Sequence, residues 1–139
     1  MDIGYTGALS GVFLVLVSVL AQHAIASAVK AKEPGAIPGK IDDALSHDSF
    51  VFRAHRTFWN SIENMPLFLG SVALAIALGV DSGSLAMAVW VFALARVAHM
   101  GLYYAIATER NPSPRSYAFM IGYLANIVIL GQCLGGLIG

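Results

Sequence analysis

Charged and polar side chains recur at helical spacing inside two otherwise apolar stretches of this chain. The first stretch carries Arg53, Arg56, Asn60, Glu63 and Asn64, and the second carries Arg96, His99, Tyr103 and Arg110. At about 100° per residue, the first set falls within an arc of roughly 100° and the second within roughly 60°. A polar stripe in an apolar helix is costly in lipid and usually marks a binding or catalytic interior. Guanidinium, hydroxyl and amide groups together suit a small anionic ligand that bears carboxylates or a thiolate.

The composition is typical of a membrane protein. Of the 139 residues, 58% are hydrophobic and only 12% are charged, with zero formal net charge. Soluble domains are about a quarter charged, and a neutral chain offers no basic surface for nucleic acid. A span needs about 20 mostly apolar residues, which predicts four transmembrane helices at roughly 4–29, 50–79, 84–108 and 115–137. The expected fold is all-α, a four-transmembrane-helix bundle that forms one domain over 1–139.

The positive charges predict the orientation of this bundle. They concentrate at the first and third connections between the expected spans, namely Lys30, Lys32, Lys40, Arg53, Arg56, Arg110 and Arg115. The second connection carries only Asp81. By the positive-inside rule, we expect a multi-pass integral membrane protein whose first and third loops are cytoplasmic and whose termini both lie outside.

Helix-breaking and capping residues mark the expected helix ends. Prolines and glycines in 34–39 exclude a continuous helix there, and Asp48 or Ser49 is expected to cap the second helix. Pro66 is expected to bend that helix just after its polar stripe. A tight turn near 79–84 makes the second and third helices an antiparallel hairpin.

Counting residues from this turn places the two stripes at matching depths. At ~1.5 Å per residue, the levels pair Glu63 with Arg96 and His99, Asn60 with Tyr103, and Arg53 with Arg110. A buried charge costs several kcal/mol unless it is paired. We therefore expect Glu63 to pair with Arg96 or Arg56, within one chain or between subunits. Nearer the cytoplasm, a cationic basin is expected from Arg53, Arg56, Tyr103 and Arg110.

Some of these residues also have simpler interpretations. Basic residues near span ends are typical interfacial anchors, which would account for Lys30, Arg53 and Arg115. Arg56 and Glu63 could form a network that only stabilises their helix. His47 and His55 are expected to be solvated.

The run from Arg56 to Pro66 resembles the R-x-x-x-N-x-x-E-N-x-P element of the MAPEG family, the membrane-associated proteins in eicosanoid and glutathione metabolism. A second block, from Ala95 through Tyr103 to Arg110, extends the resemblance. The family includes microsomal glutathione transferases, cysteinyl-leukotriene and prostaglandin E synthases, and the lipoxygenase-activating protein. The resemblance implies a small four-helix membrane protein that assembles as a homotrimer.

The resemblance also implies roles for individual residues. Tyr103 and Arg110 would be catalytic, with Arg110 stabilising the thiolate of glutathione, the co-substrate. Glutathione would be bound by residues of both stripes and of the first loop, namely Arg53, Arg56, Asn60, Glu63, Arg96, His99 and Lys30. Phe58 departs from a position that is often polar in the family, and His99 stands where some members have tyrosine. No metal site is predicted.

These roles predict a glutathione-dependent transferase or peroxidase that acts on hydrophobic, lipid-like electrophiles entering from the membrane lipids. A thiol with a pKa near 8.5 is only a few per cent ionised at pH 7, and lowering its pKa by about two units requires ~2.7 kcal/mol. One partly desolvated arginine can supply that. The alternative is a non-catalytic lipid-binding or scaffold member of the same fold. A proton-coupled carrier using Glu63, His99 and Arg96 is a third reading, for which the chain is short.

Overall fold

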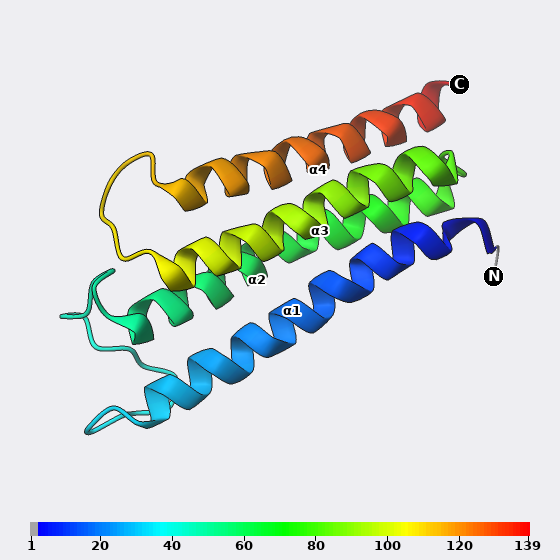
Figure 1. The fold of residues 1–139 in the computed structure, drawn as a ribbon. Coiled ribbons are helices and arrows are strands. Elements are labelled where there is room, and N and C mark those ends of the chain that lie inside the picture. The colour runs from blue at the N-terminus through cyan, green and yellow to red at the C-terminus, as the bar shows by residue number, and fades with distance from the viewer. Residues whose placement is uncertain (1–2) are drawn as a thin grey trace.

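Four long helices run antiparallel in the computed structural model, which describes residues 3–139. After a short 3-10 helix, η1 (Ile3–Tyr5), they are α1 (Thr6–Ala31), α2 (Phe50–Ala77), α3 (Ser82–Ala105) and α4 (Pro114–Ile138) (Figure 1). The described residues contain no strand. The predicted all-α four-helix bundle is therefore confirmed. Met1 and Asp2, which the predicted domain includes, lie outside the described residues.

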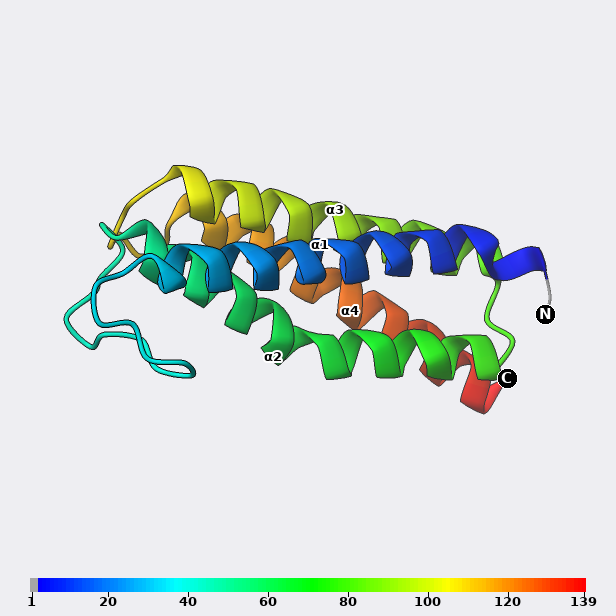
Figure 2. The ribbon, with the colours of Figure 1, turned by 90° about the horizontal axis from the view of Figure 1, so that it is seen from below.

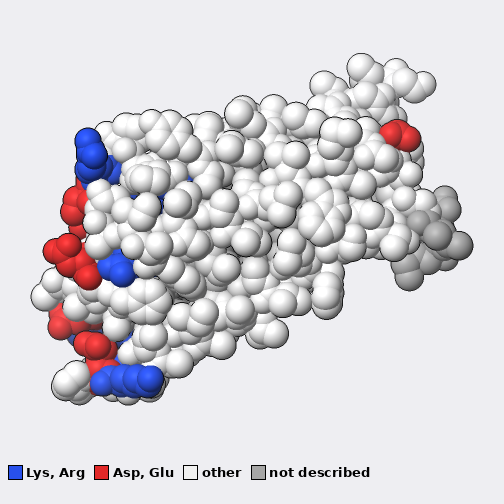
Figure 3. Space-filling model, viewed as in Figure 1, with Lys and Arg blue, Asp and Glu red and all other residues white. Residues whose placement is uncertain are grey.

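The two central helices, α2 and α3, pack against each other and against both α1 and α4. The α1–α2 and α3–α4 loops lie at one end of the bundle, called here the loop end. The α2–α3 turn and both termini lie at the opposite end (Figures 1 and 2). On the face drawn in Figure 3, lysine, arginine and acidic side chains gather at the loop end, and the middle of the bundle carries none.

Helices α1, α3 and α4 are long and apolar enough to cross a membrane. Helix α2 has 28 residues and lies alongside them, but it does not meet the same hydropathy criterion. Its polar stripe accounts for the difference, because every stretch of α2 long enough to span a membrane includes Asn60, Glu63 and Asn64. Three of the four predicted spans are thus confirmed by length and composition.

Side chains at the helix starts satisfy the backbone N–H groups that have no partner within the helix. Ser49, not Asp48, caps α2 by accepting from the Phe52 N–H at 3.4 Å. Asp81 caps α3 by accepting from the Ser84 N–H at 2.9 Å. Figure 2 shows α2 bent near its middle, as expected for a helix that contains Pro66.

Helix α3 ends three residues earlier than predicted. Its last residue is Ala105, and Ile106 is extended, with φ −117° and ψ 110°. The Thr108 carbonyl, now outside the helix, accepts from the Arg115 guanidinium at 3.4 Å. This early end matters for the site, because it removes Arg110 from the helical stripe on which it was predicted.

The apolar core fills the half of the bundle nearest the termini. Its largest fully buried side chains, Phe68 and Phe92, stack with their ring centroids 3.9 Å apart. Helices α1 and α3 approach closely at Gly11, where an added Cβ would lie 2.8 Å from the Val89 Cγ1 atom. Small residues at helix contacts are the usual means of close packing in membranes. Ser71 and Asn126 are buried beside this core, and further polar side chains of the interior, such as Gln22, Ser61 and Arg96, lie toward the loop end.

Candidate functional site

A buried polar network joins α1, α2 and α3 between the apolar core and the loop end. Arg96, which is 4% exposed, donates from Nη2 to Asn60 Oδ1 at 2.7 Å and to Ser61 Oγ at 3.1 Å. Ser61 Oγ donates in turn to Gln22 Oε1 at 2.7 Å. These hydrogen-bond partners are neutral, and the one ion pair among residues 3–139 does not involve Arg96. The Arg96 guanidinium is therefore bound inside the bundle by amide and hydroxyl oxygens, without a carboxylate.

The expected pairing of Glu63 with Arg96 or Arg56 does not form within the chain. Glu63 is exposed on the outer surface of α2, and Arg56 is half-buried. The buried face of α2 is centred on Thr57 and Ser61, about 130° around the helix from Arg56 and Glu63. Asn60, near the middle of the polar stripe, is the member that reaches Arg96. Pairing of Glu63 between subunits stays a prediction.

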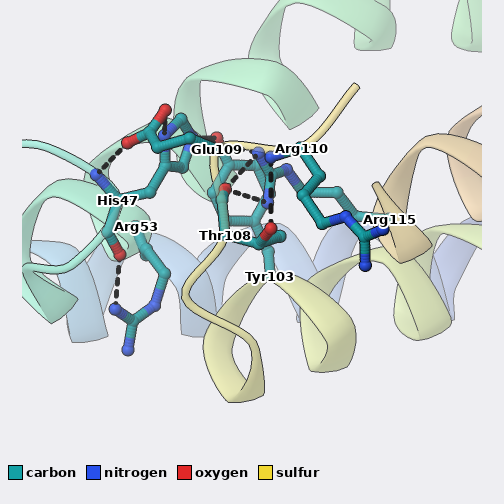
Figure 4. Close-up of polar contacts among 7 residues, drawn as sticks. All are labelled: His47, Arg53, Tyr103, Thr108, Glu109, Arg110 and Arg115. Atoms are coloured by element: carbon teal, nitrogen blue, oxygen red, sulfur yellow. Dashed lines mark hydrogen bonds and ion pairs between the residues drawn. The ribbon is translucent and has the colours of Figure 1, made fainter. Parts of the chain in front are cut away.

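A second polar cluster lies at the loop end. It consists of His47 from the α1–α2 loop, Tyr103 from α3, Glu109 from the α3–α4 loop and Arg115 from α4 (Figure 4). His47 Nε2 lies 2.9 Å from Tyr103 Oη, and His47 Nδ1 lies 2.9 Å from Glu109 Oε2. The His47 N–H also donates to Glu109 Oε1 at 3.1 Å. We call these four residues the loop-end cluster.

Arg115 completes this cluster from above the tyrosine ring. Its Cζ atom lies 4.3 Å from the ring centroid of Tyr103, and its Nη2 lies 3.2 Å from His47 Nε2. Tyr103 itself is only 7% exposed. The guanidinium is thus stacked on a buried aromatic face, an arrangement that favours arginine over lysine.

Arg53 anchors the loop that carries His47. Its Nη1 donates to the His47 carbonyl at 2.7 Å and to the Asp48 carbonyl at 3.0 Å, and its Nη2 donates to the Tyr104 carbonyl at 3.4 Å. The predicted basin residue Arg53 is therefore at the loop end beside Tyr103, but its guanidinium is used to hold backbone. Figure 4 shows it below His47.

Arg110 does not lie on the stripe of α3. It is exposed in the α3–α4 loop, and its backbone N–H donates to Thr108 Oγ1 at 3.1 Å. The predicted depth match between Arg110 and Arg53 assumed a helix that continues past Ala105, whereas α3 ends there. Arg110 remains at the loop end, and its side chain forms no hydrogen bond or ion pair with residues 3–139.

The other predicted site residues divide between interior and loop. His99 is 3% exposed, and its ring lies 5.5 Å from the Tyr103 ring, edge to face. Lys30, at the end of α1, lines a cavity of about 360 Å³ beneath the α1–α2 loop. That cavity is lined by loop residues such as Lys40 and Asp42, not by the loop-end cluster. The structure therefore brings His99 to Tyr103 but leaves Lys30 apart.

Electrostatics stabilise the carboxylate of the loop-end cluster. The hydrogen bond from the His47 backbone N–H, together with that from its ring, holds the pKa of the Glu109 carboxyl below its usual value. Glu109 lies in the loop outside the helices and is exposed to solvent. It is therefore ionised throughout the neutral range and loses its charge only in acid.

A protein-family model matches nearly the whole chain. The MAPEG family model matches residues 3–135. The chain belongs to the MAPEG family. No curated protein and no solved structure matches it. With three helices suited to spanning a bilayer, this MAPEG protein is an integral membrane protein.

Sequence reasoning missed five residues of the two clusters in this MAPEG protein. They are Gln22, His47, Ser61, Glu109 and Arg115. His47 was expected to be solvated, but its side chain is 18% exposed and fully engaged. Arg115 was interpreted as an interfacial anchor, yet it covers Tyr103. The sequence carries a signal for Gln22, because this residue is the one amide side chain in the first apolar span. It carries no signal for His47, because nothing in the sequence indicates the path of the α1–α2 loop.

Proposed function

We propose that this MAPEG protein is a membrane-embedded, glutathione-dependent transferase or peroxidase that acts on hydrophobic electrophiles. Family membership supports the reaction class, because MAPEG proteins include glutathione transferases and peroxidases alongside eicosanoid synthases. The observation that carries the proposal is the loop-end cluster, in which a guanidinium lies 4.3 Å above the buried ring of Tyr103. A sulfur beside that hydroxyl would be next to a fixed positive charge.

Two arginines are candidates for stabilising the thiolate in this proposal. Arg110 is the one that the family resemblance suggests, and its exposed position leaves it free to turn toward a bound tripeptide. Arg115 is the one in contact with Tyr103, so the geometry favours it. A positive charge within about 4–6 Å lowers the pKa of a thiol by favouring its charged form.

The remaining parts of the proposal concern assembly and access. The outward-facing Arg56 and Glu63 on α2 would meet a neighbouring protomer in a homotrimer, where glutathione could also contact Asn60 and Lys30. The loop end would face the cytoplasm. The electrophile would enter from the lipid along the apolar surfaces of the spanning helices, which expose side chains such as Leu20 and Leu124.

Substitution of the two arginines tests which of them stabilises the thiolate. We expect Arg115→Leu to raise the pKa of bound glutathione by about two units and to lower the conjugation rate with an apolar aryl halide up to ~100-fold at neutral pH. The measurements are the ultraviolet absorbance of the thiolate and the rate of conjugation in detergent. Lys40→Ala, an exposed loop cation away from the cluster, is the matched control.

The outcomes separate the assignments. If Arg110→Ala causes the loss and Arg115→Leu does not, the thiolate partner is Arg110. If the parent protein conjugates and both variants match it, neither arginine has the role. A parent that shows no thermal shift with millimolar glutathione contradicts the enzyme proposal and favours a lipid-binding or scaffold protein.

The carrier alternative loses support from the position of its acid. A proton-coupled carrier was expected to use Glu63 beside Arg96 and His99. Within the chain, Glu63 is exposed on the outward face of α2, whereas Arg96 and His99 are both buried. The three groups therefore do not share one interior path in a single subunit.

A further inference from the structure

Glu109, His47 and Tyr103 form a continuous row of hydrogen-bonded groups. The carboxylate lies 2.9 Å from one ring nitrogen of His47, and the tyrosine oxygen lies 2.9 Å from the other. The row runs from a largely exposed carboxylate, through a half-buried imidazole, to a buried phenol. It connects the proposed sulfur position to solvent.

The neighbours of His47 determine which of its nitrogens carries the proton. An arginine side chain has no acceptor, so the contact from Arg115 Nη2 at 3.2 Å requires a lone pair on His47 Nε2. The proton of the neutral ring then lies on Nδ1, where it is donated to the Glu109 carboxylate. A carboxylate that holds one nitrogen of an imidazole orients the other as a base, as in other acid–histidine pairs. Nε2 therefore carries the lone pair that can accept a proton, and the Tyr103 hydroxyl at 2.9 Å and the Arg115 guanidinium at 3.2 Å are the two donors that compete for it.

We infer that His47, oriented by Glu109, acts as a proton acceptor for the glutathione thiol, through the hydroxyl of Tyr103. This inference rests on the proposed function. In the step, the S–H bond breaks and its proton passes to Tyr103 Oη, while the Tyr103 proton passes to His47 Nε2. The products are a thiolate and an imidazolium, and Tyr103 is neutral before and after. No oxidant or other reactant is needed.

The surrounding charges act differently on the two products. Arg115 favours the thiolate, whereas the imidazolium is favoured by the Glu109 carboxylate and opposed by Arg115, whose Nη2 lies 3.2 Å from His47 Nε2. The imidazolium would lie between the Glu109 carboxylate and the Tyr103 oxygen, so its new charge is paired. Protonated Nε2 has no lone pair left for Arg115, which frees that guanidinium for the thiolate. The other charged group facing His47 is Arg53 of α2, whose contact is with the His47 carbonyl and not the ring. His47 is thus a positioning and relay residue, since it reaches sulfur only through Tyr103.

The rate of thiolate formation tests this inference. Full-length protein in detergent is mixed rapidly with glutathione, and thiolate absorbance is followed across the pH range. The parent rate should depend on pH, because the relay needs a neutral imidazole at position 47. His47→Gln keeps hydrogen bonding but cannot accept the proton, so its rate should fall at least about tenfold and lose that pH dependence. Glu109→Gln should show a smaller loss, and His23→Gln, a substitution of an exposed histidine on α1, should behave as the parent.

Each result decides between the relay, a structural role and the proposed function. A slower His47→Gln rate with a changed pH profile and nearly unchanged glutathione affinity supports the relay. If His47→Gln weakens affinity or thermal stability but keeps the parent pH profile, His47 only holds the loops together and the inference is wrong. If the parent binds no glutathione, the proposed function itself fails and the relay with it.

Discussion

At the scale of single residues, Ser61 is the junction of the buried network. Its hydroxyl accepts from Arg96 at 3.1 Å and donates to Gln22 at 2.7 Å, so one small side chain joins three helices. The Ser61 side chain is buried, with 4% of its surface exposed. Removing it would leave the Gln22 amide oxygen without a partner and the Arg96 guanidinium with one fewer acceptor.

We therefore expect Ser61→Ala to destabilise the protein by about 1 kcal/mol, the range measured for hydrogen bonds inside membrane proteins. Thermal unfolding in detergent measures the change. Ser10→Ala is the matched control, because the Ser10 hydroxyl is exposed and bonds only within its own helix, to the Gly7 carbonyl. Equal midpoints for the two variants would show that the network contributes nothing to stability.

At the scale of the elements, α1 and α3 are held together by a glycine that allows close approach. The missing side chain of Gly11 leaves room for Val89, which is fully buried. One turn of α1 before Gly11, the Gly7 carbonyl accepts a hydrogen bond from the Trp90 indole at 3.0 Å. The contact sets the position of α3, and so of Arg96 and Tyr103, relative to α1.

Gly11→Ala should lower stability by about 1–3 kcal/mol, because a Cβ 2.8 Å from a valine methyl forces the helices apart. Gly122→Ala is the control, since its added Cβ would meet its nearest neighbour at 3.7 Å, an ordinary contact. The readout is again thermal unfolding in detergent. A Gly11→Ala protein as stable as Gly122→Ala would mean that α1 shifts freely on α3.

At the scale of the whole molecule, charge is segregated along the bundle axis. Lysine, arginine and acidic side chains gather at the loop end (Figure 3), and the α2–α3 turn at the opposite end carries Asp81. The antiparallel arrangement requires the two loops to share one side of a membrane. The positive-inside rule favours the cytoplasm for that side.

Cysteine labelling measures this orientation directly. The natural thiol, Cys133, is buried, so single cysteines at exposed loop positions report the side. Lys40→Cys should react with an impermeant maleimide only in inside-out membrane vesicles, and Asp81→Cys only in right-side-out vesicles. The reverse pattern would place the loop end outside and separate the site from cytoplasmic glutathione.

The sequence alone was sufficient for the helices and their order. Their positions depend on hydropathy, on caps such as Ser49 and on breakers such as Gly79, which takes φ +69° in the α2–α3 turn. All of these act over a few residues. Burial of Arg96 and His99 was also predicted, because a polar side chain in an apolar span is costly in lipid. The same argument was wrong within the chain for Glu63, which is exposed.

Only the tertiary structure decided which polar groups meet. The face that α2 presents to α3 depends on packing along its whole length, and it brings Asn60 and Ser61 to Arg96 while Glu63 turns outward. The early end of α3 moved Arg110 into a loop. His47 reaches Tyr103 from 56 residues away along a loop without periodicity. Local propensity acts within a turn or two of helix, whereas these contacts depend on the path of two loops and the rotation of helices, which only the assembled bundle determines.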